Sequence, residues 1–285
     1  MENKGVEFSL QASLLRTRNF EWIVGGNIAK STAKLKALGG EKQVILDGNY
    51  NGMQLVNRVG ESPYQFYGYQ ADGVFSTQAE ADEAALVNRT GRSYSAGDVR
   101  FVDQNGDHRI DDKDRVLLGS ASPDYFGGFY TQLKYKGLAL SAEFSYSKGN
   151  MAYNAVRQQL ESMSTTNNQS LSVLNRWTVD GQKTDVPRAR WKDPVGNSYF
   201  SSRWIEDASY LRLKNVTLSY TFSKTVWNFF RSGTLYVTGE NLLTFTDYLG
   251  MDPEFSSSYS ENVQGLDYGK LMQPKTVKVG VNLKF

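Results

Sequence analysis

The sequence contains no cysteine, a single histidine and only six prolines. Without cysteine there is no disulfide framework, no thiolate nucleophile and no Cys-based metal site. The single histidine, His108, lies in an Asp-rich segment and does not support a Ser-His-Asp triad. No pair of carboxylates stands out for acid–base work, so we expect no enzymatic activity. Because 32 Lys and Arg face 30 Asp and Glu, the chain also lacks the concentrated basic face of a nucleic-acid binder.

Long hydrophobic runs are absent as well, and the mean hydropathy is −0.49. No segment approaches the roughly 20 apolar residues that a membrane-spanning helix needs. Residues Met1 to Gly5 have no apolar core, so they are not a signal peptide, and an exported protein would need sequence upstream of them. A membrane β-barrel also has low mean hydropathy, because its strands alternate apolar and polar residues, and it is rich in interfacial aromatics. Aromatic residues make up 13% of the chain, which leaves open a soluble all-β protein or a membrane barrel.

Seven segments alternate apolar and polar residues with a period of two, the pattern of strands with one apolar face. Each is close to the 9–11 residues that a tilted membrane-crossing strand needs and longer than the 5 or 6 of a typical globular strand. The last segment is the most regular, with Val277, Val279 and Val281 on one side and Lys278 and Asn282 on the other. The predicted strands are about Val6–Arg16, Phe20–Lys30, Asp124–Tyr135, Leu138–Lys148, Ser209–Phe222, Thr234–Phe245 and Thr276–Phe285.

Short and long connections alternate between these strands. Outer-membrane barrels show this asymmetry, with short periplasmic turns and long extracellular loops, whereas compact soluble domains rarely carry several long loops. We therefore predict an all-β fold, an antiparallel transmembrane β-barrel segment of about seven or eight strands that closes only with further strands upstream. The short connections are 17–19, 136–137 and 223–233, and the long ones are about 31–123, 149–208 and 247–273.

Three local features refine this interpretation. We expect Gln43–Val59 to form a hairpin within the first long loop, because residues 47–52 are rich in turn formers. We interpret Phe285, an aromatic ending an alternating strand, as a barrel-assembly signal. Gly25-Gly26 and Gly127-Gly128 lie inside strand patterns and indicate bulges or close packing.

The strongest chemical motif is an Asp-rich segment, residues 103–114, with the spacing of an EF-hand calcium loop. His108 replaces the glycine of its sixth position and would need a positive φ, which is tolerated though uncommon. Asp114 replaces the usual glutamate at the twelfth. The predicted ligands of a structural Ca²⁺ are Asp103, Asn105, Asp107, the Arg109 carbonyl, Asp111 and Asp114, and the alternative is a turn with solvated carboxylates.

Aromatic side chains also cluster in the long loops. They could stack on a sugar ring or a peptide, but packing of the loops on one another is the interpretation that we favour. These residues are Tyr64, Phe66, Tyr67, Tyr69, Trp177, Trp191, Tyr199 and Phe200.

Several motifs together resemble the C-terminal region of SusC/RagA-type TonB-dependent outer-membrane transporters. A short acidic helix is expected at Gln78–Ala85, between the first motif and the second. The second leads into the Asp-rich loop, as its counterpart does in that family. The motifs are Phe66–Phe75 (FYGYQADGVF), Gly97–Asp103 (GDVRFVD), Gly119–Gly128 (GSASPDYFGG), Ala208–Tyr220 (ASYLRLKNVTLSY) and Thr238–Thr246 (TGENLLTFT), the last followed by Asp252-Pro253-Glu254.

The resemblance implies a 22-stranded barrel with a plugged lumen in the cell outer membrane. It also implies energy from TonB, a SusD-like surface lipoprotein as a lid, and import of glycans or peptides. No plug domain or TonB box is visible in the sequence, so TonB would act through a region that this chain lacks. The alternative from another class is a soluble, Ca²⁺-stabilised β-sandwich that binds carbohydrate or acts as an adhesin. The outer face of Thr276–Phe285 discriminates between them, because a sandwich must cover it with a second sheet.

Overall fold

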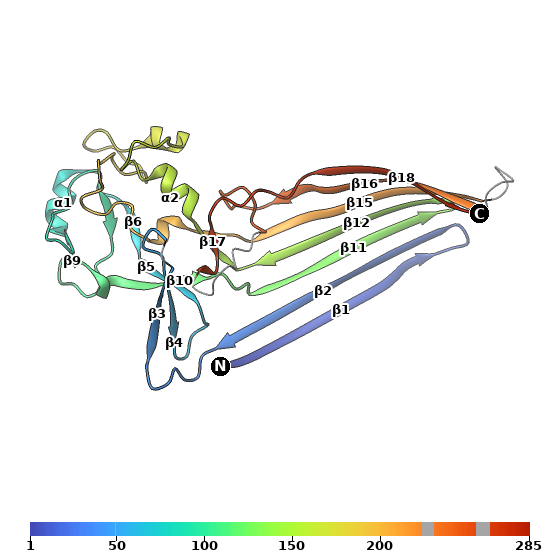
Figure 1. The fold of residues 1–285 in the computed structure, drawn as a ribbon, viewed down its shortest axis with the longest axis horizontal. Helices are drawn as coiled ribbons and strands as arrows, with labels where there is room; N and C mark the ends of the chain where they lie inside the picture. Colours follow the sequence, from blue (N-terminus) through green and yellow to red (C-terminus); the bar gives the residue numbers. More distant parts are fainter. Residues whose placement is uncertain (49, 224–230, 255–262) are drawn as a thin grey trace.

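The computed structural model describes residues 1–48, 50–223, 231–254 and 263–285. A seven-stranded antiparallel sheet dominates the fold, and its strands follow one another as a meander (Figure 1). All seven predicted strands are present, and the first two are longer than expected. The strands are β1 (Glu2–Arg16), β2 (Phe20–Lys34), β11 (Tyr125–Tyr135), β12 (Leu138–Lys148), β15 (Tyr210–Ser223), β16 (Ser232–Phe245) and β18 (Thr276–Lys284).

The register of the sheet places apolar residues opposite apolar residues from strand to strand. Leu140 on β12 pairs with Leu133 on β11 and with Leu218 on β15. Leu218 pairs in turn with Val237 on β16, which pairs with Val279 on β18. Because side chains alternate between faces with a period of two, this register gives the whole sheet one apolar and one polar face.

The two kinds of connection lie at opposite ends of the long strands. Figure 1 shows the short strands and helices gathered at one end, while the turns 17–19 and 136–137 and the C-terminus lie at the other. The predicted asymmetry is therefore present. Of the connections predicted at 223–233 and 247–273, residues 224–230 and 255–262 lie outside the described residues.

The long connections carry more regular structure than the sequence predicts. The hairpin expected in Gln43–Val59 is formed by β3 and β4, and the expected short helix is α1. No described helix reaches the length and apolar character needed to span a membrane. The connections contain β3 (Gln43–Asp47), β4 (Gln54–Arg58), β5 (Gln65–Tyr69), β6 (Ala71–Val74), α1 (Gln78–Ala84), β7 (Val87–Asn88), β8 (Val99–Phe101), β9 (Arg109–Ile110), β10 (Arg115–Ser120), β13 (Met151–Asn154), α2 (Ala155–Glu161), β14 (Ile205–Asp207) and β17 (Leu266–Asp267).

The buried hydrophobic core lies in these connections rather than against the long sheet. One cluster joins Phe66 of the first connection, Tyr153 and Trp204 of the second, and Leu266 of the third. A second cluster surrounds Phe101. The four residues of the first cluster are fully buried, so their burial holds the three connections together as one packed structure.

Glycines in the long strands allow close packing between neighbours. A β-carbon at Gly127 would lie 2.1 Å from the backbone oxygen of Asn27 on β2. The Tyr130 ring covers the space above Gly25, where a β-carbon would meet it at 2.5 Å. Of the two expectations for these glycine pairs, close packing is therefore confirmed, and the register shifts of the sheet occur elsewhere.

Substituting Gly127→Ala should destabilise the sheet by about 1–3 kcal/mol, because a methyl group cannot fit beside the Asn27 carbonyl without moving the backbone. The thermal unfolding temperature of the detergent-purified protein, followed by circular dichroism, measures the effect. Gly5→Ala on β1 is the control, since its methyl group would meet nothing nearer than 3.2 Å. Equal unfolding temperatures for the two variants would contradict the prediction.

Candidate functional site

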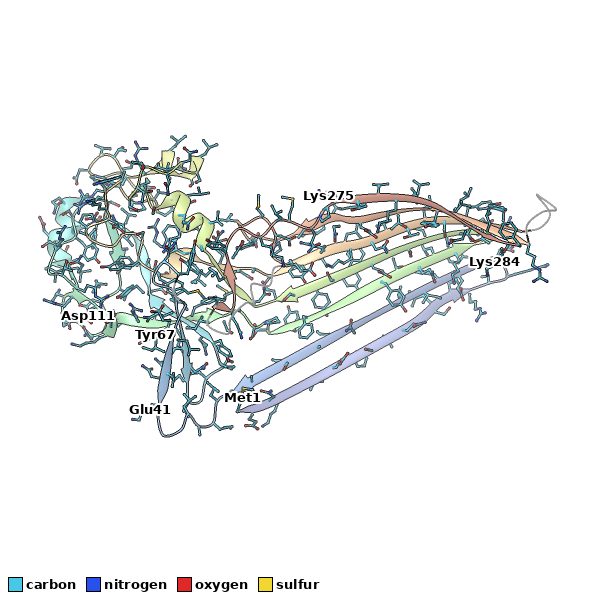
Figure 2. All side chains as sticks on the ribbon, in the orientation of Figure 1. Met1, Glu41, Tyr67, Asp111, Lys275 and Lys284 are labelled. Atoms are coloured by element: carbon cyan, nitrogen blue, oxygen red, sulfur yellow. The ribbon has the colours of Figure 1, made fainter. Side chains whose placement is uncertain are left out.

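One face of the long sheet is a continuous apolar surface that no described element covers. Val279 is 80% exposed, Leu10 60% and Leu218 44%. Figure 2 shows the side chains of the long strands projecting away from the sheet, whereas the side chains of the connections crowd together. Soluble monomers rarely expose contiguous apolar patches above a few hundred Å². This apolar band includes Val6, Phe8, Leu10, Trp22, Ile28, Phe129, Leu140, Leu218, Val237, Leu243, Val277, Val279, Val281 and Leu283.

The opposite face of the same strands is polar and cross-linked by ion pairs. Lys134 of β11 lies 3.2 Å from the carboxylate of Glu21 on β2, and Lys278 of β18 lies 2.6 Å from that of Glu240 on β16. Each pair bridges adjacent strands. Charged groups on this face and apolar groups on the other are the arrangement of a barrel wall with a polar interior.

The Asp-rich loop is closed by hydrogen bonds from its own backbone. Asp103 accepts hydrogen bonds from the N–H groups of Gly106 and His108, at 2.8 and 2.7 Å. Burial alone would raise the pKa of Asp103, but these and neighbouring N–H donors outweigh it and hold the pKa below its usual value. His108 has a φ of 59°, so the predicted positive φ is confirmed, and its Nδ1 lies 3.0 Å from the Ala84 carbonyl at the end of α1.

Other predicted ligands also accept hydrogen bonds from backbone N–H groups of the loop. Asp107 accepts from the Arg109 N–H, and Asn105 from the Asp107 N–H, both at 3.0 Å. Asp114 is fully buried and accepts from the Asp111 N–H at 2.8 Å. The two residues form a capping box around a short 3₁₀ turn, residues 112–114.

Within the described residues, no three His, Cys, Asp or Glu side chains are grouped so that they could hold a metal ion. The donor types suit Ca²⁺. Calcium at this loop stays a prediction from its spacing.

Two buried carboxylates, neither chosen as a candidate site from the sequence, organise the connections. Asp98 is fully buried and receives a two-pronged contact from Arg188, at 2.8 and 2.9 Å. The side-chain amide of Asn197 donates to the same carboxylate at 3.0 Å. Asp98 lies in the Gly97–Asp103 motif, so the motif has a structural role that its spacing alone does not reveal.

Asp252 is the second, and it ties the third connection to the sheet. It forms an ion pair with Arg212 of β15, and both side chains are almost completely buried. Glu254 lies 3.2 Å from Arg212 and 2.6 Å from Lys214. Burial would raise the pKa of Asp252, but the Arg212 guanidinium and two backbone N–H donors lower it below its usual value. Two motifs of the resemblance, Ala208–Tyr220 and Asp252-Pro253-Glu254, are thus physical partners.

Most of the loop aromatics pack against each other, as favoured from the sequence. The rings of Phe66 and Phe200 lie 6.3 Å apart, and those of Tyr69 and Tyr199 5.5 Å apart. Trp191 is the exception, because it is 61% exposed.

Phe285 follows the last residue of β18, at the end of the molecule where the short connections lie (Figure 1). Its side chain is 76% exposed. A role for it as an assembly signal stays a prediction.

Comparisons with known proteins agree with this architecture. No family model matches the chain. The TonB-dependent receptors P3 and P26 of Formosa agariphila are 32% and 33% identical, and each match covers 100% of this chain and 29% of the receptor. The TonB-dependent receptor SusC of Bacteroides thetaiotaomicron is 26% identical, with 100% of this chain and 26% of the receptor covered.

A solved structure shares the fold. The structure of the RagAB peptide transporter aligns with a TM-score of 0.78 and 24% identity, over 99% of this chain and 29% of that one. The fold is therefore an antiparallel segment of a β-barrel wall with large connections on one side. The resemblance to SusC/RagA-type TonB-dependent receptors is confirmed along the whole chain. The chain spans less than a third of the length of these relatives.

Substituting Asp252→Asn should cost up to about 3–5 kcal/mol at pH 7, because it removes the buried carboxylate that pairs with Arg212 and leaves only the more exposed Glu254 beside the guanidinium. Since the folded pKa of Asp252 is lowered, the wild-type advantage is complete above the unfolded pKa of about 3.9 and disappears as the pH falls through the folded value. Urea unfolding in detergent at pH 7 and at pH 2 measures the cost of the substitution and its loss at low pH. Asp247→Asn, at an exposed position of the same connection, is the control. A difference in unfolding free energy between wild type and Asp252→Asn that is the same at pH 7 and pH 2 would contradict this role of the ion pair.

If the Asp-rich loop binds calcium, CaCl₂ should raise the unfolding temperature of the protein. At a Ca²⁺ concentration of 100 times the Kd, the free energy of unfolding should increase by about 2.7 kcal/mol. Differential scanning calorimetry in CaCl₂ and in EDTA measures it. Asp107→Ala removes one predicted ligand at an exposed position and should abolish the rise. Identical wild-type traces in CaCl₂ and EDTA would exclude the calcium site.

Proposed function

We propose that this chain forms part of the wall and the extracellular loops of a TonB-dependent importer in the outer membrane. The observation that carries the proposal is the apolar band, which runs across all seven long strands and is exposed to the surroundings. In a membrane barrel, lipid chains contact such an apolar face, and no protein partner is needed to cover it. The soluble β-sandwich requires a second sheet over the band, and the described residues supply none.

The open edges of the sheet support a barrel of more than seven strands. β1 pairs only with β2, and β18 only with β16, within the described residues. An unpaired strand edge is costly in a membrane, because lipid offers no hydrogen bonds to its backbone groups. Further strands on both edges would complete the wall, with the polar face of Lys134 and Lys278 toward the lumen.

The imported ligand would be captured by the connections. The long strands place this packed structure at one rim of the wall, and the short turns lie at the other (Figure 1). A packed structure at the outer rim suits capture of oligosaccharides or peptides beneath a SusD-like lipoprotein lid. TonB would supply energy through a plug that belongs to another region of the receptor. One aligned structure is described as a peptide transporter, which supports peptides as one substrate class.

Substituting Val279→Lys should cost about 2–4 kcal/mol if the band faces lipid at mid-membrane depth. Less protein should then reach the outer-membrane fraction in its folded form. Asn282→Lys is the matched control, because it places the same charge on the polar face of the same strand. The folded amount of each variant is measured by the shift in gel mobility on heating. If Val279→Lys assembles as well as Asn282→Lys, the band does not face lipid.

A further inference from the structure

A polar cleft of about 570 Å³ opens among the packed connections. Tyr69 of β5 and Arg115 of β10 line it from the first connection, together with Arg89, which follows β7. Gln159 of α2 and Tyr199 line it from the second connection. Among the described lining residues there are two arginines and no carboxylate, and most of the others carry hydroxyl or amide groups. The cleft therefore presents hydrogen-bond donors and positive charge to whatever enters it.

Asp112 forms ion pairs with both arginines, although it does not itself line the cleft. One of its carboxylate oxygens lies 3.1 Å from Arg89 Nη2, and the other lies 3.1 Å from Arg115 Nη2. A single carboxylate between two guanidinium groups leaves one net positive charge. The cluster can therefore accept one more anionic group without a like-charge penalty.

Arg115 is held in place before any ligand arrives. Its side chain is only 11% exposed, and its guanidinium lies 5.2 Å from the centroid of the Tyr69 ring. Its Nη1 donates to the side-chain oxygen of Gln54. The buried Nε–H has no acceptor among the described residues. Because its planar fork is already ordered, Arg115 would lose little conformational freedom on binding a carboxylate.

We propose that this cleft binds a carboxylate group of the imported ligand through Arg89 and Arg115. The hydroxyl and amide groups around them would hold the adjoining polar chain. The inference rests on the proposed function and narrows its substrate to oligomers that carry carboxylates. Acidic peptides and uronic-acid oligosaccharides share that chemistry.

Isothermal titration calorimetry on the protein purified from outer membranes in detergent tests this assignment. The probes are triglutamate with its N-terminus acetylated and its C-terminus amidated, and trigalacturonate. Each is compared with an uncharged counterpart, the acetylated and amidated triglutamine and fully methyl-esterified trigalacturonate. We expect at least one charged probe to bind tenfold or more tightly than its counterpart, and the probe that does so identifies the source of the carboxylate. Arg89→Gln should weaken that binding about tenfold or more, and should reduce the ratio of the affinities for the charged probe and its uncharged counterpart.

Arg89→Gln is the principal variant because Arg89 is half exposed and its loss should leave the fold intact, whereas the Arg115 side chain is only 11% exposed. Arg100→Gln is the control, since Arg100 pairs with Asp72 and does not line the cleft. Equal binding of charged and uncharged probes, or unchanged binding in folded Arg89→Gln, would overturn the assignment. Failure of the proposed function would appear differently, as a wild-type chain that never enters the outer membrane.

Discussion

The structure depends on one constraint, the fixed register of seven long strands. Because side chains alternate with a period of two, a register that pairs Leu140 with Leu133 and Leu218 commits every neighbouring side chain to a face. A slip of one residue in any strand would place charged groups such as Lys278 in the apolar band. The same constraint exposes apolar side chains on one face and provides a polar, ion-paired face on the other. The proposed lipid-facing surface and the proposed lumen both follow from this register.

The packed connections have a different physical basis. Their stability comes from burial of side chains such as Trp204 and Tyr153 and from buried charges such as Asp98, rather than from long strand pairing. Arg212 and Asp252 link these two parts of the molecule. Burying this ion pair carries a free-energy cost, because both charged groups lose their hydration. The ion pair fixes the position of the third connection relative to the end of β15.

The long strands could be predicted from the sequence because alternation over such lengths has few other interpretations. The connections, beyond the hairpin of β3 and β4 and the helix α1, could not be predicted, since strands of two to six residues show no usable period and their core unites Phe66, Tyr153 and Leu266 from distant segments. The Asp-rich loop lies between these cases. Its spacing predicted the positive φ of His108, because a tight loop needs that conformation whether or not it holds a metal. The partners of Asp98 and Asp252, and the meeting of Arg89 with Arg115, depend on tertiary contacts that spacing does not encode.

The most direct measurement is the solvent environment of each residue from Thr276 to Phe285 in native membranes. The chain has no cysteine, so single cysteines can carry a nitroxide label without background, and its accessibility to oxygen and to a water-soluble nickel complex can be compared. A barrel wall predicts alternation with a period of two, with oxygen favoured at 277, 279, 281 and 283. Uniform access of the nickel complex to all positions would show that the apolar band is in water, and would contradict the account.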